Sequence, residues 1–151
     1  MTLKNQLNDD LKDAMRKGEV TKRATIRLLL SAIRNEEIAQ QKELENEGIL
    51  LVASKQAQQR LESIDAFNSA KRDDLVAKEQ AELDVIKLYL PEPFSNNKIT
   101  QIIESVISET GATGPQDIGK VMGKIIPQTR GRADGKQISE KVGELLRKMV
   151  E

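Results

Sequence analysis

The 151-residue sequence contains no cysteine, no histidine and no tryptophan. Without cysteine there are no disulfides and no thiolate nucleophiles, and without either cysteine or histidine nearly all zinc and iron sites are excluded. The lack of histidine also removes the most common general acid–base group. We therefore expect no metal site and no cofactor.

Aromatic residues and long apolar runs are also scarce. The only aromatic residues are Phe67, Tyr89 and Phe94, too few for the stacking platforms that bind single-stranded nucleic acid. The apolar runs are only a few residues long, which excludes a membrane span. The first fifteen residues place charged residues and leucine at helical spacing, unlike a signal or transit peptide. We expect a cytoplasmic protein without a membrane partner.

Charge is balanced overall but not along the chain. The 24 basic and 24 acidic residues cancel, which argues against a general attraction to nucleic acid or membranes. Residues 118–137, however, contain five basic residues and one acidic residue, a local net charge of +4. A binding site for a polyanion is therefore expected in this segment.

Helical spacing of apolar residues dominates the first half of the chain. It predicts a helix from Leu3 that ends at Gly18, and a second helix with Thr21 as N-cap. Beyond Ile38 the second helix becomes polar until Gly48. We interpret residues 36–60 as a hairpin that projects from the body.

The rest of the sequence predicts five further helices. Two run from Ala53 to Phe67 and from Leu75 to Leu90, and the second is stopped by Pro91 and Pro93. Because residues 91–95 are the best linker, we predict an N-terminal domain of residues 1–94 and a C-terminal domain of residues 95–151.

In the C-terminal domain the helices are marked by their ends. Ser95 caps the first, which ends at Gly111; Pro115 begins a short one that Pro127 closes; and Asp134 caps the last. No segment alternates apolar and polar residues in the manner of a strand. The fold class is all-α: two helical subdomains, the N-terminal one a bundle with the protruding hairpin.

Residues 117–136, DIGKVMGKIIPQTRGRADGK, contain four of the nine glycines. Residues 114–120 match the first seven positions of a phosphate-binding P-loop, but Val121 has no hydroxyl for Mg²⁺, Pro115 lacks an amide, and no strand precedes them. Gly119 and Gly123 share a helix face. Their spacing fits either close packing of two helices or close approach of the backbone to a ligand.

The cations of this segment are the candidate nucleic-acid contacts. Lysine and arginine beside flexible glycines are suited to holding phosphates without reading base sequence, although a solvated loop without a partner has the same composition. The candidate nucleic-acid-binding residues are Lys120, Lys124, Arg130, Gly131, Arg132, Gly135 and Lys136.

No set of residues predicts an active site. Ser95 and Lys98 have the spacing of a serine–lysine nucleophile, but Ser95 stands where a helix needs its N-cap. Neighbouring carboxylates such as Glu36 and Glu37 point about 100° apart on a helix, so they do not converge on a substrate. Residues 56–63 form a polar helix face that is either solvated or an interaction surface. We predict no catalytic residues.

Several segments together resemble the YqeY family, small bacterial proteins of the GatB/YqeY class. They are residues 55–64, 82–91 (ELDVIKLYLP), 109–112, 117–123 and 131–136. The resemblance implies an all-helical fold in two parts. The C-terminal part is similar to the tail of the B subunit of the tRNA-dependent amidotransferase, which engages tRNA while other domains perform the chemistry. A carbon–nitrogen ligase activity with glutamine as amide donor would belong to that larger enzyme.

Two hypotheses follow from the residues and the resemblance. The first is an accessory, translation-related module that contacts the tRNA backbone through its basic glycine-rich loop, with no active site of its own and no expected DNA partner. The alternative is a helical adaptor that docks on amidotransferase subunits or another translation factor through residues 36–60.

Overall fold

The structure is a computed structural model that describes residues 2–151. All secondary structure in this part of the chain is helical, so the all-α prediction is confirmed. The helices in chain order are α1 (Leu3–Lys17), α2 (Val20–Gln40), α3 (Asn46–Ser69), α4 (Asp73–Lys87), α5 (Asn96–Thr110), the 3₁₀ turn η1 (Pro115–Asp117), α6 (Ile118–Thr129) and α7 (Gly135–Lys148). None of them is long and apolar enough to cross a membrane.

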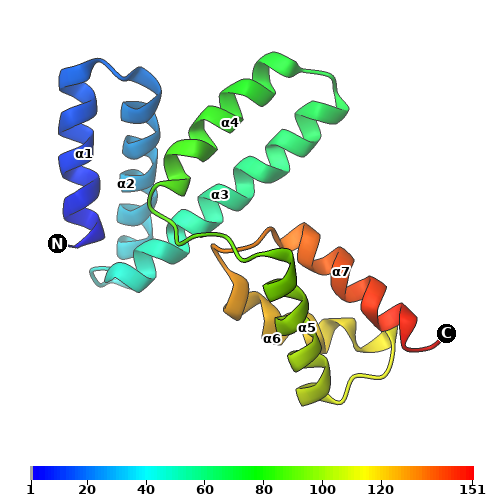
Figure 1. Cartoon of the computed structure of the whole chain (residues 1–151). Helices are drawn as coiled ribbons and strands as arrows, with labels where there is room; N and C mark the ends of the chain where they lie inside the picture. The colour runs from blue at the N-terminus through cyan, green and yellow to red at the C-terminus, as the bar shows by residue number, and fades with distance from the viewer. Residues whose placement is uncertain (1) are drawn as a thin grey trace. The chain divides into compact units, whose positions relative to one another are not determined.

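The chain divides into two compact units, each with its own hydrophobic core. The first unit runs to Pro91 and the second covers Glu92–Glu151, whereas our predicted boundary lies between residues 94 and 95. Figure 1 shows α1 to α4 in the first unit and α5 to α7 in the second. Because the cores are separate, each unit is described by itself.

The N-terminal unit consists of two helical hairpins. In Figure 1, α1 runs antiparallel to α2 and α3 runs antiparallel to α4. Each helix contributes apolar residues at helical spacing to one shared core, which excludes water from their side chains. The buried core residues are Leu7, Ile26, Leu29, Ile33, Ile49, Val52, Ala53, Ala57, Leu83, Ile86 and Tyr89.

The boundaries of α2 and α3 differ from the prediction. Helix α2 starts at Val20, so Thr21 lies inside it rather than at the N-cap. It ends at Gln40, where Gln41 adopts a left-handed conformation with φ of 56°. Helix α3 begins at Asn46 and tolerates Gly48 in its first turn. The polar stretch that we read as one continuing helix is therefore a loop between two helices.

The segment 36–60 does not project as a whole, because Ile49, Val52, Ala53 and Ala57 belong to the core, whereas Ile38 and Leu51 are exposed. Ile49 and Ala53 are 3% exposed. Glu37 ties the loop between α2 and α3 to α1. Its Oε2 accepts hydrogen bonds from Lys4 Nζ at 2.7 Å and from the Leu44 amide at 2.8 Å. The Lys4 ammonium and then the Leu44 amide hold the pKa of Glu37 below its usual value.

A buried tyrosine ties the end of α4 to α1. Tyr89 is 6% exposed, and its hydroxyl donates a 2.6 Å hydrogen bond to Asp10 Oδ2. Burial, and then the neighbouring carboxylate, raise the pKa of the Tyr89 phenol, so it stays a donor at physiological pH. Helix α4 itself ends at Lys87, earlier than Pro91 requires.

In the C-terminal unit, α5, α6 and α7 surround a second core. The predicted ends of α5 are confirmed: Ser95 Oγ accepts from the Lys98 amide, and Gly111 takes a left-handed φ of 69°. Asp134 caps α7 as predicted. The buried core residues are Ile99, Ile103, Val106, Ala112, Val121, Ile125, Ile138, Val142 and Leu146.

Helix α6 does not end before Pro127, contrary to the prediction. It continues to Thr129 with Pro127 inside it. A proline there cannot donate to the carbonyl of Gly123, the residue four positions earlier. Both residues lie on the exposed side of the helix, where water can satisfy this carbonyl. The cost of an internal proline is therefore small enough for the helix to persist.

Candidate nucleic-acid interface

Helix α6 presents two opposite faces. Val121, Ile125 and Thr129 recur every four residues and are buried. The residues about half a turn away are Gly119, Gly123 and Pro127, and all three are exposed. The core side of the helix is thus held by packing, and its outer face displays mainly backbone.

The outer face is bare because nothing covers its glycines. A Cβ added to Gly119 or Gly123 would meet no atom within 4 Å. Of the two interpretations left open by the sequence, close helix–helix packing is therefore wrong within the described chain. An uncovered helix backbone remains, and a ligand can approach it more closely than a surface with side chains would allow.

One flank of this bare face is cationic. Lys120 and Lys124 lie one turn apart, and both are exposed. Lys124 Nζ is paired with Glu109 Oε1 at 3.0 Å, with side-chain exposures of 50% and 59%. Within residues 2–151, neither Lys120 nor Arg130 lies within ion-pair distance of a carboxylate. Two cations of the set are therefore unpaired, and one is in an exposed ion pair.

The loop after α6 uses its predicted residues mainly to build its own structure. Gly131 adopts φ of 79°, a left-handed conformation that favours glycine. The guanidinium of Arg132 stacks over the Phe94 ring at 3.9 Å from its centroid, and its Nε donates to the Glu92 carbonyl at 2.9 Å. The Phe94 amide in turn donates to the Arg132 carbonyl at 2.7 Å. Arg132 therefore links the start of the C-terminal unit, at Glu92 and Phe94, to the loop after α6.

The other predicted loop residues belong to the start of α7. Gly135 is the first residue of that helix, and the Lys136 amide donates to the Asp134 carboxylate at 3.1 Å. Asp134, Gly135 and Lys136 each make a further interaction within the chain. Lys136 is exposed at the beginning of the helix, apart from the continuous outer face of α6.

The turn before α6 is fixed by Asp117. Its Oδ2 accepts from the Thr113 amide at 2.9 Å and lies 3.4 Å from the Thr113 hydroxyl. The Thr113 amide is the main cause that lowers the pKa of Asp117, and Lys120 adds to the effect. The carboxylate therefore stays ionised and orients the first turn of α6, on which Lys120 stands.

Replacing Arg132 should destabilise the C-terminal unit even when the positive charge is kept. Arg132→Lys removes the planar stack on Phe94 and the Nε–H bond to Glu92. We expect a loss of about 1–2 kcal/mol in the free energy of unfolding, since a cation–π contact and a hydrogen bond each contribute about 0.5–1.5 kcal/mol. Urea denaturation measures it. Lys120→Gln is the control and should be near neutral; an Arg132→Lys variant as stable as wild type would contradict the structural role.

Comparison with known proteins identifies the family. The Yqey-like protein family matches residues 4–146, nearly the whole chain. The chain belongs to the YqeY family. This confirms the resemblance seen in the sequence. The family match by itself assigns neither a function nor a catalytic activity.

The YqeY-like chain has named relatives in fungi. It is 38% identical over 126 residues to Altered inheritance of mitochondria protein 41, mitochondrial, of Saccharomyces cerevisiae, covering 79% of this chain and 68% of that protein. The protein of the same name from Pyrenophora tritici-repentis is 33% identical over 144 residues, covering 93% and 79%. That of Eremothecium gossypii is 46% identical over 85 residues, covering 56% and 46%.

These relatives contradict two of our expectations. We expected a bacterial family and a cytoplasmic location, but the relatives are eukaryotic proteins whose names place them in mitochondria. The absence of a leader-like pattern in the first fifteen residues misled us, because such a pattern describes one segment of sequence and not the place where a folded domain works.

Two features of this YqeY-like surface were missed by the sequence reasoning. Glu109 is distant from Lys124 in sequence, and only the packing of α5 against α6 brings the two together. On the flank of α6 opposite the lysines, Ile118 is 37% exposed and Ile126 is 40% exposed. Their i, i+8 spacing was visible in the sequence, but we drew no conclusion from it.

The other polar clusters considered in the sequence have structural explanations. Ser95 acts as a helix cap rather than a nucleophile. On the face of α3, Arg60 bonds Gln56 Oε1 at 2.7 Å, and its Nε lies 3.5 Å from Glu82 Oε2 on α4. These side chains therefore join the two helices. No group of three or more metal-ligating side chains exists in the described part of the chain.

Proposed function

We propose that this YqeY-like chain is an accessory RNA-binding protein that contacts the tRNA backbone through the outer face of α6. The observation that carries the proposal is the bare face of Gly119 and Gly123, flanked by the unpaired cations Lys120 and Arg130. The resemblance of the C-terminal part to an amidotransferase tail that engages tRNA supports the choice of RNA. The proposal assigns the chain no active site.

Three cations are suited to hold phosphates on this face. Lys120 and Arg130 are unpaired, and the Lys124–Glu109 pair is exposed. Exposed ion pairs contribute little to stability, so a phosphate can replace Glu109 at low cost. Arg132 keeps its stacking role and Lys136 its place in α7. The structure thus favours about three phosphate contacts instead of the four or five that composition suggests.

The bare backbone adds a reason for RNA rather than DNA. Pro127 has no N–H for the carbonyl of Gly123, and this carbonyl lies on the exposed side of α6. A ribose 2′-hydroxyl is a donor that can reach such an acceptor when no side chain intervenes. One short segment of RNA backbone can therefore contact both parts of this surface, with its phosphates on the lysine flank and a ribose on the glycines.

The test is a salt titration of tRNA binding to the double variant Lys120→Gln with Arg130→Gln. The α6 face should contribute roughly −2 to −3 to the log–log slope of the wild type, from about three contacts at about 0.7–0.9 each. The variant should bind about tenfold more weakly at about 0.1 M salt, with a slope shallower by about 1.5–2. The matched control is Lys98→Gln with Lys148→Gln, which removes two exposed lysines of the same unit.

Two outcomes of this titration would refute the proposal. One is the absence of tRNA binding by the wild-type chain at low salt. The other is equal binding by the Lys120/Arg130 variant and the Lys98/Lys148 control. A DNA duplex of matched length should bind more weakly than RNA, since it has no 2′-hydroxyl.

A protein adaptor remains the second candidate, favoured by the exposed Ile118 and Ile126 beside the same face. Exposed apolar side chains next to polar ones are typical of protein interfaces. The docking surface would then be α6, because the apolar residues Ile49, Val52, Ala53 and Ala57 of segment 36–60 are packed in the N-terminal core. Ile118→Ser with Ile126→Ser should abolish capture of an amidotransferase subunit or translation factor while tRNA affinity stays unchanged. The reverse result favours RNA.

A further inference from the structure

Helix α2 of the N-terminal unit carries three arginines along one side. Arg23, Arg27 and Arg34 are four and seven positions apart, which places them within about 40° of one another around the helix axis. Residues 20–35 contain four basic residues and no acidic residue. We call these three side chains the arginine ridge.

The arginine ridge is unpaired, unlike most of the other cations of the α1–α2 hairpin. Lys4 pairs with Glu37, Lys17 with Asp13, and Lys22 lies 4.0 Å from Glu19. Within residues 2–151, none of the three arginines lies within ion-pair distance of a carboxylate. Arg27 instead reaches the Met15 sulfur at 3.7 Å. The ridge therefore keeps its full positive charge.

The charges of the ridge do not stabilise helix α2. A helix is stabilised by acidic residues in its first turn and by basic ones in its last turn, and α2 has neither. Arg23 instead lies near the positively charged N-terminus. Arg23 and Arg27 are also a like-charge pair one turn apart, which is unfavourable. Helix stability thus gives no reason for this pattern, and a negatively charged ligand does.

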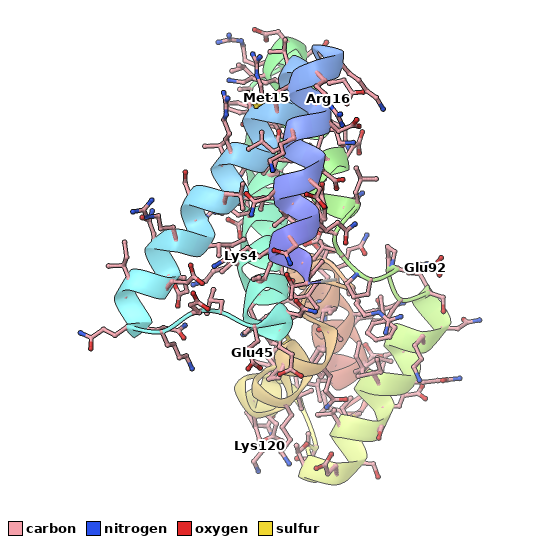
Figure 2. The ribbon with its side chains drawn as sticks, turned by 90° about the vertical axis from the view of Figure 1, so that its left-hand side faces the viewer. Lys4, Met15, Arg16, Glu45, Glu92 and Lys120 are labelled. Carbon is pink, nitrogen blue, oxygen red and sulfur yellow. The ribbon has the colours of Figure 1, made fainter. Side chains whose placement is uncertain are left out.

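The surface around the ridge is open. Met15, which Arg27 contacts, also lines a hollow of about 460 Å³ together with Asp9, Lys12 and Arg16 of α1. Figure 2 shows Met15 and Arg16 at the end of α1 beside the start of α2, and nitrogen-tipped side chains along the outer side of α2. Arg27 and Arg34 are exposed and Arg23 is half-buried, so within the N-terminal unit a ligand can reach the ridge from solvent.

We propose that the arginine ridge binds the phosphates of an RNA strand, as a second contact separate from α6. Along the axis, the arginines are spaced by about 6 Å and about 10 Å, at 1.5 Å per residue. Arginine is suited to phosphate binding because its planar fork matches a phosphate with two parallel hydrogen bonds.

A nucleic acid fits the ridge better than a lipid surface does. The exposed large apolar residues of α2 are Val20, Leu28 and Ile38, separated by about 12 and 15 Å along the axis. Polar Ser31 and Asn35 lie between the last two. A membrane-binding helix needs a continuous apolar face that enters the bilayer, and α2 offers only isolated side chains.

The experiment uses the full chain with Arg23→Gln, Arg27→Gln and Arg34→Gln together. At about 0.1 M salt we expect tRNA to bind about tenfold more weakly, with the log–log slope shallower by about 2. The matched control removes three other exposed, unpaired cations of the same unit, Lys55→Gln, Lys78→Gln and Lys87→Gln, and should change affinity less than twofold. Circular dichroism should show the same helix content in both variants.

The inference and the proposed function can fail separately. If the ridge variant binds tRNA like wild type while Lys120→Gln with Arg130→Gln weakens binding, the ridge inference is overturned and α6 remains the contact. If only the ridge variant weakens binding, the ridge stands and the α6 proposal fails. A last experiment is sedimentation with phosphatidylserine vesicles. If vesicle binding depends on the ridge while RNA affinity does not, the ligand of the ridge is a lipid surface and the RNA inference is overturned.

Discussion

Replacing Gly119 and Gly123 together by alanine should stabilise the C-terminal unit and weaken tRNA binding at the same time. Alanine in a helix interior is more stable than glycine by about 0.5–1 kcal/mol per site. Both positions have room for a Cβ. We therefore expect the free energy of unfolding to rise by about 1–2 kcal/mol. A unit of this size should then melt roughly 4–16 °C higher.

The same methyl groups should reduce binding because they fill the face that the RNA backbone is proposed to touch. Thermal unfolding and tRNA titration of one preparation measure both effects. Gly143→Ala is the matched control: it lies in α7, where a Cβ would meet only Ile118 Cδ1 at 4.0 Å, so it should raise stability without changing affinity. A Gly119/Gly123 variant that is more stable yet binds normally would show that the bare face is not a contact.

Replacing Ile125 by alanine should unfold the C-terminal unit selectively. Ile125 is fully buried and anchors α6 in its core. Truncating a buried isoleucine to alanine costs about 2–5 kcal/mol. The unit covers residues 92–151 only, and a domain of about 60 residues has little stability to lose. The outer face of α6 should disappear with the helix packing that presents it.

The chain supplies its own probe for this experiment. It contains one tyrosine and no tryptophan, and Tyr89 is buried in the N-terminal core. Tyrosine fluorescence therefore follows the N-terminal unit, whereas far-UV circular dichroism follows all helices. We expect an early transition in circular dichroism only. The control is Ile126→Ala, the neighbouring isoleucine that is 40% exposed, which should cost far less. Coincident shifts of both signals would mean that the two units unfold as one.

Local signals in the sequence predicted several helix ends correctly. Gly18 and Gly111 end α1 and α5 in the left-handed conformation, and Ser95 and Asp134 cap α5 and α7 through their side chains. Each of these ends depends on one residue and its own backbone, so no knowledge of distant contacts is needed. Helical spacing of apolar residues likewise identified the all-α class.

Two failures of prediction involve partners distant in sequence or the solvent. The end of α2 at Gln40 follows from the loop that Glu37 ties to Lys4 of α1. The continuation of α6 through Pro127 depends on that side of the helix facing water. Neither condition can be read from neighbouring residues, because neither the contact nor the exposure exists until the chain is folded.

For the candidate interface, the sequence by itself determined which residues carry charge and which positions lack a side chain. The segment 117–136 was recognisable from its glycines and cations alone. Only the tertiary structure decided how these residues are used: Gly119 and Gly123 face solvent, Arg132 is held on Phe94, and Lys124 is shared with Glu109. The physical reason is that charge and side-chain size are properties of a residue, whereas exposure and pairing are properties of the packed chain.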